Sequence, residues 1–151
     1  MPLQSRRLET TFRIEWIDEA MKENELKLRM FVNGQAMSGG AINFSLKGAA
    51  FLGNVKTAAK YRFYSVRDEF PGLFPAAENG SMVPGELYEV SYKQLRERLL
   101  PNEPEELELT VIELEDGSGS LSMRLRDTAL DLPGVIDISE KGGWLAYRAG
   151  R

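Results

Sequence analysis

The loop after residues 28–32 contains the residues best suited to hold a ligand through the main chain. The apolar run "LRMFV" ends at Asn33 and Gly34, and two more glycines follow at residues 39–40. Glycine lets a backbone approach a ligand without an intervening Cβ, and successive N–H groups can bind an anion. Asn before Gly is also common in ordinary turns. The loop therefore predicts either a corner of the chain or an anion-binding site.

Acid–base chemistry in this chain must use residues other than histidine and cysteine, because the sequence has neither. Histidine is the usual base at neutral pH and the commonest metal ligand, so Glu, Asp, Lys or Tyr must do such work. In the strand-like segment "MVPGELYEV", Glu86 and Tyr88 fall on one face and Leu87 on the other. That face either lines a pocket or faces water. No phosphate-binding loop, nucleophile elbow or metal motif is present in the sequence, so no cofactor and no metal are expected.

Length and composition predict one small domain. The chain has 151 residues, of which 42% are hydrophobic, enough for a single core. We predict an N-terminal extension over residues 1–25, loosely attached at its start with a short strand and helix after it, and a domain over residues 26–151. The formal charge of −4 argues against a nucleic-acid partner. No apolar run reaches the roughly 20 residues of a membrane span, and the expectation is a soluble cytoplasmic protein.

Apolar periodicity and turn residues predict most of the strands. Strands are expected over residues 26–32, 50–55, 60–67 and 82–90. The stretch 69–81 contains Pro-Gly and Asn-Gly and is predicted to be a turn-rich connection. Its "FPGLFP" segment either forms a lid over a pocket or packs through Phe70 and Phe74.

The second half predicts one short helix, a hairpin and an aromatic tail. Ser91 is a good N-cap for a helix that must stop by Pro101. Residues 107–125 alternate on either side of a Gly-rich turn, which predicts a hairpin with one apolar face. In the tail "DISEKGGWLAYR", Trp144 and Tyr147 are expected to cover the core. Strands that surround one short helix favour an α+β fold, a curled sheet or small mixed β-barrel with flanking short helices.

Several of these segments, in this order, resemble the γ-glutamylcyclotransferase-like superfamily. They are "MFVNGQAMSGG", "GAAFLGNVKTAAKYRFYSV", "FPGLFPA" and "VPGELYEV". The tail "DISEKGGWLAYR" is similar to one branch, the C-terminal domain of allophanate hydrolases. The resemblance covers about residues 28–148 and implies a small barrel, flanked by helices, with a pocket at one end.

The resemblance implies an amide lyase or transferase that uses a glutamate as base. In cyclotransferases of this type the substrate's amine attacks its own γ-carbonyl, which yields 5-oxoproline and a free amine. A carboxylate collects and returns the proton, while loop N–H groups hold an acidic group or oxyanion. Family members place this glutamate just after the short helix, where "LLPNE" puts Glu103. Glu86 is a second candidate, Glu105 and Glu106 are rivals, and an acidic solvated turn is the simpler interpretation.

The loop departs from both family patterns. The usual Tyr-Gly-Ser/Thr-Leu is replaced by "NGQA", residues 33–36, and Ala36 falls where allophanate hydrolases commonly carry histidine. Asn33 and Gln35 can still offer amide donors to a carboxylate or ureido group, or serve as turn caps. The predicted substrate-binding set is Asn33, Gly34, Gln35, Ala36, Met37 and Tyr88. Four cationic residues near the pocket strands either attract an anion or only keep the surface polar: Lys47, Lys56, Lys60 and Arg62.

Three functions compatible with the sequence follow. The first is a cyclotransferase or related amide lyase with Glu103 or Glu86 as base. The second is a module that binds a small carboxylated or ureido metabolite without turnover. The third is an accessory domain that docks on an amidase or allophanate hydrolase subunit. We expect the chain to act as a separate protein rather than as part of an amidase.

Overall fold

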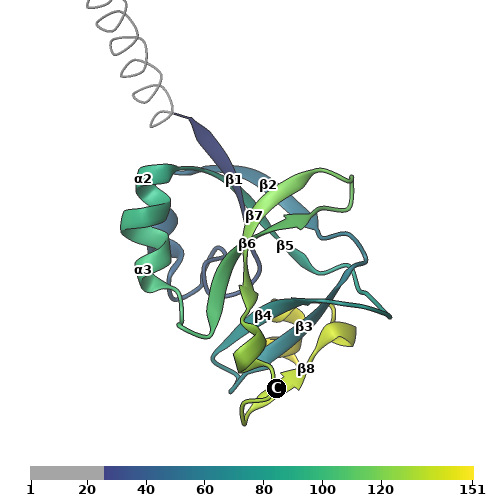
Figure 1. The fold of residues 1–151 in the computed structure, drawn as a ribbon. Coiled ribbons are helices and arrows are strands. Elements are labelled where there is room, and N and C mark those ends of the chain that lie inside the picture. Colours follow the sequence, from purple (N-terminus) through teal and green to yellow (C-terminus); the bar gives the residue numbers. More distant parts are fainter. Residues whose placement is uncertain (1–25) are drawn as a thin grey trace, which may run out of the picture.

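The computed structural model describes residues 26–151. The predicted extension, residues 1–25 with its short strand and helix, lies outside the described residues. The described part contains two sheets with short helices beside them, and Figure 1 shows one sheet above the other. The predicted α+β class is therefore confirmed.

The larger sheet is five-stranded, in the order β2-β5-β1-β7-β6. Its strands are β1 (Lys27–Val32), β2 (Ala50–Lys56), β5 (Pro84–Ser91), β6 (Leu107–Glu113) and β7 (Gly119–Leu125). The central strand β1 pairs antiparallel with β5 and parallel with β7. The two edge strands approach each other at a bridge between Thr57 and Leu114. Among residues 26–151 the sheet curls strongly but does not close, so the predicted barrel is not confirmed.

The smaller sheet is three-stranded, in the order β4-β3-β8, with β3 (Tyr61–Val66), β4 (Phe70–Pro75) and β8 (Val135–Asp137). The prediction of a turn or lid at "FPGLFP" is wrong, because this segment forms β4. Pro71 is tolerated there because β4 is an edge strand, where a missing N–H removes no central ladder bond. Phe70, Pro71 and Leu73 are buried between the two sheets.

The β6–β7 hairpin is confirmed, but its predicted apolar face is only partly buried. Leu107 and Leu125 pack against β3 and β4, whereas Leu109 and Val111 are exposed. On the opposite face Ser120 and Ser122 are almost completely buried, and each hydroxyl donates to the carbonyl of the next residue. Small side chains with locally satisfied hydroxyls let β7 pack closely inside the sheet, which apolar periodicity does not reveal.

The short helix runs from Tyr92 to Asn102 as α2 (Tyr92–Gln94), a π-helical segment η2 (Leu95–Leu99) and α3 (Leu100–Asn102). Ser91 is its N-cap, because its Oγ accepts a hydrogen bond from the Gln94 N–H at 3.0 Å. The helix ends one residue after Pro101. Figure 1 shows it against one side of the five-stranded sheet, where Leu95 and Leu99 are buried in the main core.

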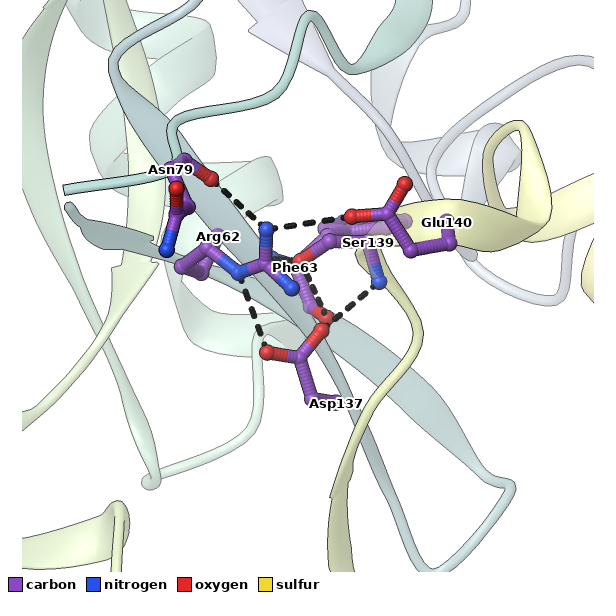
Figure 2. A network of polar contacts seen from close by, with 6 residues as sticks. All are labelled: Arg62, Phe63, Asn79, Asp137, Ser139 and Glu140. Carbon is purple, nitrogen blue, oxygen red and sulfur yellow. Dashed lines mark hydrogen bonds and ion pairs between the residues drawn. The ribbon is translucent and has the colours of Figure 1, made fainter.

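The C-terminal segment covers the other end of the domain through η4 (Ser139–Lys141) and α4 (Trp144–Ala149). Trp144 and Tyr147 are buried there, as predicted. A polar network fixes this segment to β3 (Figure 2): the Arg62 guanidinium donates to Asp137, Glu140 and the Asn79 carbonyl. Three short helical turns complete the fold, η1 (Asn43–Leu46), η3 (Asp127–Ala129) and the turn η4 already named.

Residues 26–151 contain no helix with the length and apolar character that a membrane crossing requires.

Candidate functional site

A cavity of about 180 Å³ lies between the two sheets, at the point where the 33–36 loop, β4 and the end of the short helix meet. Its volume is below the roughly 300–1,000 Å³ of sites for drug-sized ligands, so it suits a small metabolite. Its wall is mainly apolar, with a few polar groups. The lining residues include Asn33, Gly34, Gln35 and Ala36 from the loop, Phe70 and Pro71 from β4, Glu103 after α3, and Ser122 and Met123 from β7.

The loop presents unused hydrogen-bond donors at this cavity. The N–H groups of Gly34, Gln35 and Ala36 donate to no acceptor within residues 26–151. Their neighbours are engaged, since the Met37 N–H donates to the Gly34 carbonyl and the Ser38 N–H to Glu86. Three successive free N–H groups beside a cavity form an anion-binding arrangement. Asn33, a residue that is 9% exposed, adds a side-chain amide that forms no hydrogen bond in the described part of the chain and stays accessible.

Two glycines are needed in this loop for close packing. A Cβ on Gly34 would lie 2.3 Å from Cδ of Pro71, and a Cβ on Gly40 would lie 2.1 Å from the Gln35 carbonyl oxygen. Neither glycine has a positive φ. Gly34 thus lets the loop pack directly on β4, which holds the free N–H groups at the cavity wall.

Glu103 brings a carboxylate into the same cavity. The sequence positions it there through Pro104, because the residue before a proline is driven out of the helical region. Glu103 accordingly ends the helix with φ −80° and ψ 145°. Its carboxyl makes no hydrogen bond or ion pair within residues 26–151, and burial raises its pKa from the ordinary 4.5 to about 7. A carboxyl with such a pKa can both accept and donate a proton at neutral pH.

The other predicted base, Glu86, has a different environment. It is 8% exposed, and its Oε1 accepts hydrogen bonds from the Ser38 N–H at 2.7 Å, the Ser38 hydroxyl and the Tyr88 hydroxyl. The Tyr88 hydroxyl also accepts from Asn43 Nδ2 at 3.4 Å. Neither Glu86 nor Tyr88 lines the first cavity. Together they fix the far end of the loop through the chain of contacts from β5 to Ser38.

Comparison with known proteins bears directly on this site. The sequence model of the allophanate hydrolase C-terminal domain matches residues 28–149. The chain belongs to this family. The resemblance seen in the sequence is therefore confirmed. The first cavity lies beside the loop at residues 33–36 and the helix end at Glu103, the two places to which the resemblance assigned function.

Relatives of this allophanate hydrolase C-terminal domain occur in much larger proteins. Urea amidolyase of Saccharomyces cerevisiae is 28% identical over 127 residues, which cover 80% of this chain but 7% of that protein. Allophanate hydrolase of Kluyveromyces lactis superposes with a TM-score of 0.76 and 25% identity, over 82% of this chain and 21% of that one. The chain thus spans a small fraction of the length of these relatives.

A similar structure of domain size also exists. A uropathogenic E. coli-specific protein superposes with a TM-score of 0.76 and 29% identity, over 83% of this chain and 98% of its own. An AIG2-like protein from Mus musculus shares the fold alone, with a TM-score of 0.54 and 22% identity.

In this allophanate hydrolase C-terminal domain, the predicted site residues do not all lie at one cavity. The first cavity collects the loop from Asn33 to Ala36 with Glu103, whereas Met37 and Glu86 line a second cavity. Gln35 has a mainly structural part, because its amide donates to the Glu69 carbonyl and accepts from the Ala41 N–H. Glu106 pairs with Arg67 and Glu105 is exposed, so neither rival of Glu103 reaches the cavity.

The predicted cationic residues do not line this cavity. Lys60 pairs with Glu113, Arg62 pairs with Asp137 and Glu140, and Lys56 lines the second cavity. Within the described chain, an anion in the first cavity would therefore be held by N–H groups rather than by Lys or Arg.

Sequence reasoning missed the residues that β4 and β7 contribute to the site. Phe70 and Pro71 line the cavity because their segment forms a strand, and Ser122 lines it because the serine face of β7 turns inward. The alternation of serines at residues 118, 120 and 122 was a signal, since a polar face of small residues packs closely when its hydroxyls bond locally.

The raised pKa of Glu103 predicts a pH-dependent loss of stability. Because the folded-state pKa of about 7 exceeds 4.5, the contribution of Glu103 to the free energy of unfolding is most favourable below pH 4.5 and is lost as the pH rises through 7. The full shift corresponds to about 3 kcal/mol, and partial solvent contact reduces it to about 2 kcal/mol. Glu103→Gln should therefore gain about 2 kcal/mol over the parent at about pH 8 and little at about pH 4.

Urea unfolding at both pH values measures this difference. Glu105→Gln, two residues away at an exposed position, should follow the parent at both pH values. Equal stabilities of Glu103→Gln and the parent at the higher pH would show that the Glu103 carboxyl is fully solvated.

The contact chain between Tyr88 and the loop gives a second stability prediction. Tyr88→Phe keeps the ring, which packs at 5.4 Å from Phe51, but removes the hydroxyl that donates to Glu86 and accepts from Asn43. A buried carboxylate that loses a donor costs about 1–2 kcal/mol. Thermal unfolding should detect it, whereas Tyr92→Phe, at an exposed tyrosine, should change the unfolding free energy by less than about 0.5 kcal/mol. Equal effects of the two substitutions would contradict the anchoring role.

Proposed function

We propose that this domain catalyses acid–base chemistry on a small amide that carries a carboxylate, with Glu103 as the base. The observation that carries the proposal is the shared cavity, where a carboxyl of pKa about 7 lies with a row of N–H groups and neither has a partner in the described chain. The N–H groups of Gly34 to Ala36 bind the substrate carboxylate or the developing oxyanion. The apolar wall made by Phe70, Pro71 and Met123 lowers the polarity around the reacting groups.

The reaction that uses both the Glu103 carboxyl and the N–H groups is the cyclisation of a γ-glutamyl amide with release of its amine. The substrate's α-amine attacks the γ-carbonyl carbon, forming the lactam C–N bond, and the C–N bond to the leaving amine breaks. The Glu103 carboxylate takes the proton from the attacking ammonium and returns it to the leaving nitrogen. Atoms balance without a cofactor, since the products are 5-oxoproline and an amine.

Incubation with γ-glutamyl amides, with chromatographic detection of 5-oxoproline, tests this proposal. Formation of 5-oxoproline that depends on enzyme concentration supports it. Absence of product for a range of leaving amines would contradict the cyclotransferase activity.

A binding function without turnover is the second candidate, and the loop sequence favours it. Ala36 lines the cavity with a methyl group, and the described structure places two titratable side chains among the cavity residues, Glu103 and an exposed Glu69 that is paired with Arg67. Such a site can hold a carboxylated or ureido metabolite through N–H groups without a second proton donor.

A thermal-shift screen of small carboxylates and ureas distinguishes this candidate. A ligand at 100 times its dissociation constant stabilises a protein by about 2.7 kcal/mol. Stabilisation that Gly34→Ala abolishes, in a protein that forms no product, would support binding alone.

A docking role on an amidase rests on the relatives. Urea amidolyase and allophanate hydrolase carry this domain within much longer chains, so we propose that an amidase-type subunit is a natural partner of this domain. Copurification with a separately expressed amidase would support it, and separate elution in size-exclusion chromatography at micromolar concentrations would count against it.

A further inference from the structure

A second cavity, of about 460 Å³, lies between β2, β5, the tip of the β6–β7 hairpin and the start of α4. This volume falls within the range of sites for small organic ligands. It shares no lining residue with the first cavity. Its wall includes Met37, Lys56, Glu86, Glu115 and Trp144.

The distinctive group in this cavity is one oxygen of the Glu86 carboxylate. Glu86 is buried, with 8% of its surface exposed. All the hydrogen bonds that its side chain accepts go to Oε1. Its Oε2 accepts no hydrogen bond from residues 26–151. Every side-chain oxygen of these residues that is fully buried has a hydrogen-bond partner, so Oε2 is not fully buried. Oε2 is therefore reachable by a small donor, and the cavity that Glu86 lines is the second one.

The charges around the cavity favour a positively charged ligand. Within residues 26–151 neither Glu86 nor Glu115 forms an ion pair, and the only cationic residue on the wall, Lys56, is exposed. A buried carboxylate without a cationic partner is stabilised by a ligand that brings both charge and N–H donors. The described residues contain no cluster of acidic groups suited to a metal ion, so an organic cation fits better.

We propose that this second cavity binds a small organic cation, an ammonium or guanidinium compound, whose N–H group donates to Glu86 Oε2. The ligand's apolar part lies against Met37 and the Trp144 ring, and Glu115 adds a second carboxylate at the exposed rim. This site is separate from the Glu103 cavity and does not depend on the activity proposed for it.

Fluorescence of Trp144 tests the proposal directly. The chain has two tryptophans, Trp16 and Trp144, so a Trp16→Phe background leaves Trp144 as the sole reporter. Titration with methylammonium chloride and with methylguanidinium chloride should give a saturable change for at least one probe, and the stronger response identifies the cation type. Tetramethylammonium chloride, which has no N–H donor, should give none.

Two variants locate the binding. Ala146→Phe fills the cavity from α4 without touching Glu86 and should abolish the response, while Glu86→Gln should weaken binding by about tenfold or more. Glu103→Gln, in the other cavity, should bind as the parent does. Circular dichroism of each variant establishes that it is folded. No saturable change with either probe, or an unchanged response in Ala146→Phe, would overturn the proposal.

Discussion

Replacing Glu103 by Gln should lower kcat for 5-oxoproline formation by about 10²–10⁴-fold, because positioned proton transfer typically contributes that much. Gln is nearly isosteric with a protonated Glu, so the cavity that Glu103 lines keeps its shape and KM should change little. The loss therefore reports the proton transfer itself rather than a packing defect.

The pH profile gives an independent measure of the same residue. If the carboxylate form of Glu103 is required in the free enzyme, kcat/KM should rise with pH around an apparent pKa of about 7. Glu105→Gln, at an exposed neighbouring position, is the matched control and should keep parental turnover. Parental kcat in Glu103→Gln would exclude Glu103 as the base and leave the binding function as the better account of the cavity.

Replacing Gly34 by Ala should produce a large loss of stability. The new Cβ would lie 2.3 Å and 2.6 Å from Cδ and Cγ of Pro71, whose strand β4 is held by β3. Because neither segment can yield easily, overpacking should cost about 3 kcal/mol, or a fall of about 10 °C in Tm. Ligand binding at the loop N–H groups should weaken as well.

A double-mutant cycle tests that mechanism. Pro71→Ala removes the two ring carbons that the new Cβ would strike, so Gly34→Ala should be much less harmful in the Pro71→Ala background. Gly119→Ala is the matched control, since its Cβ would meet no atom closer than 3.7 Å, and it should change stability by less than about 0.5 kcal/mol. Equal losses for Gly34→Ala in both backgrounds would place the strain elsewhere.

Glu103 and Glu86 line different cavities and have different surroundings. Within residues 26–151 the Glu103 carboxyl has no partner and lies beside N–H groups that also have none, whereas Glu86 uses one oxygen to hold the loop at Ser38. Both glutamates were candidates for the base on sequence grounds. Only their surroundings separate them, because Oε1 of Glu86 accepts three hydrogen bonds, whereas the Glu103 carboxyl accepts none from residues 26–151 and has a raised pKa.

The sequence by itself determined the local features of this protein. Strand periodicity predicted β1, β2, β3 and β5, the Ser91 cap predicted the helix start, and the motif order identified the family. Even the conformation of Glu103 followed from the proline after it, because that restriction acts between adjacent residues. These features depend on interactions close along the chain.

Tertiary structure alone decided what lines the site. The "FPGLFP" segment became a strand because an edge position accepts Pro71, and β7 turned Ser120 and Ser122 inward, where both are buried. The same long-range packing set Glu103 against the loop and raised its pKa. Contacts between residues far apart in sequence decide which face of a strand is buried and which carboxyl is desolvated. A single sequence does not record those contacts.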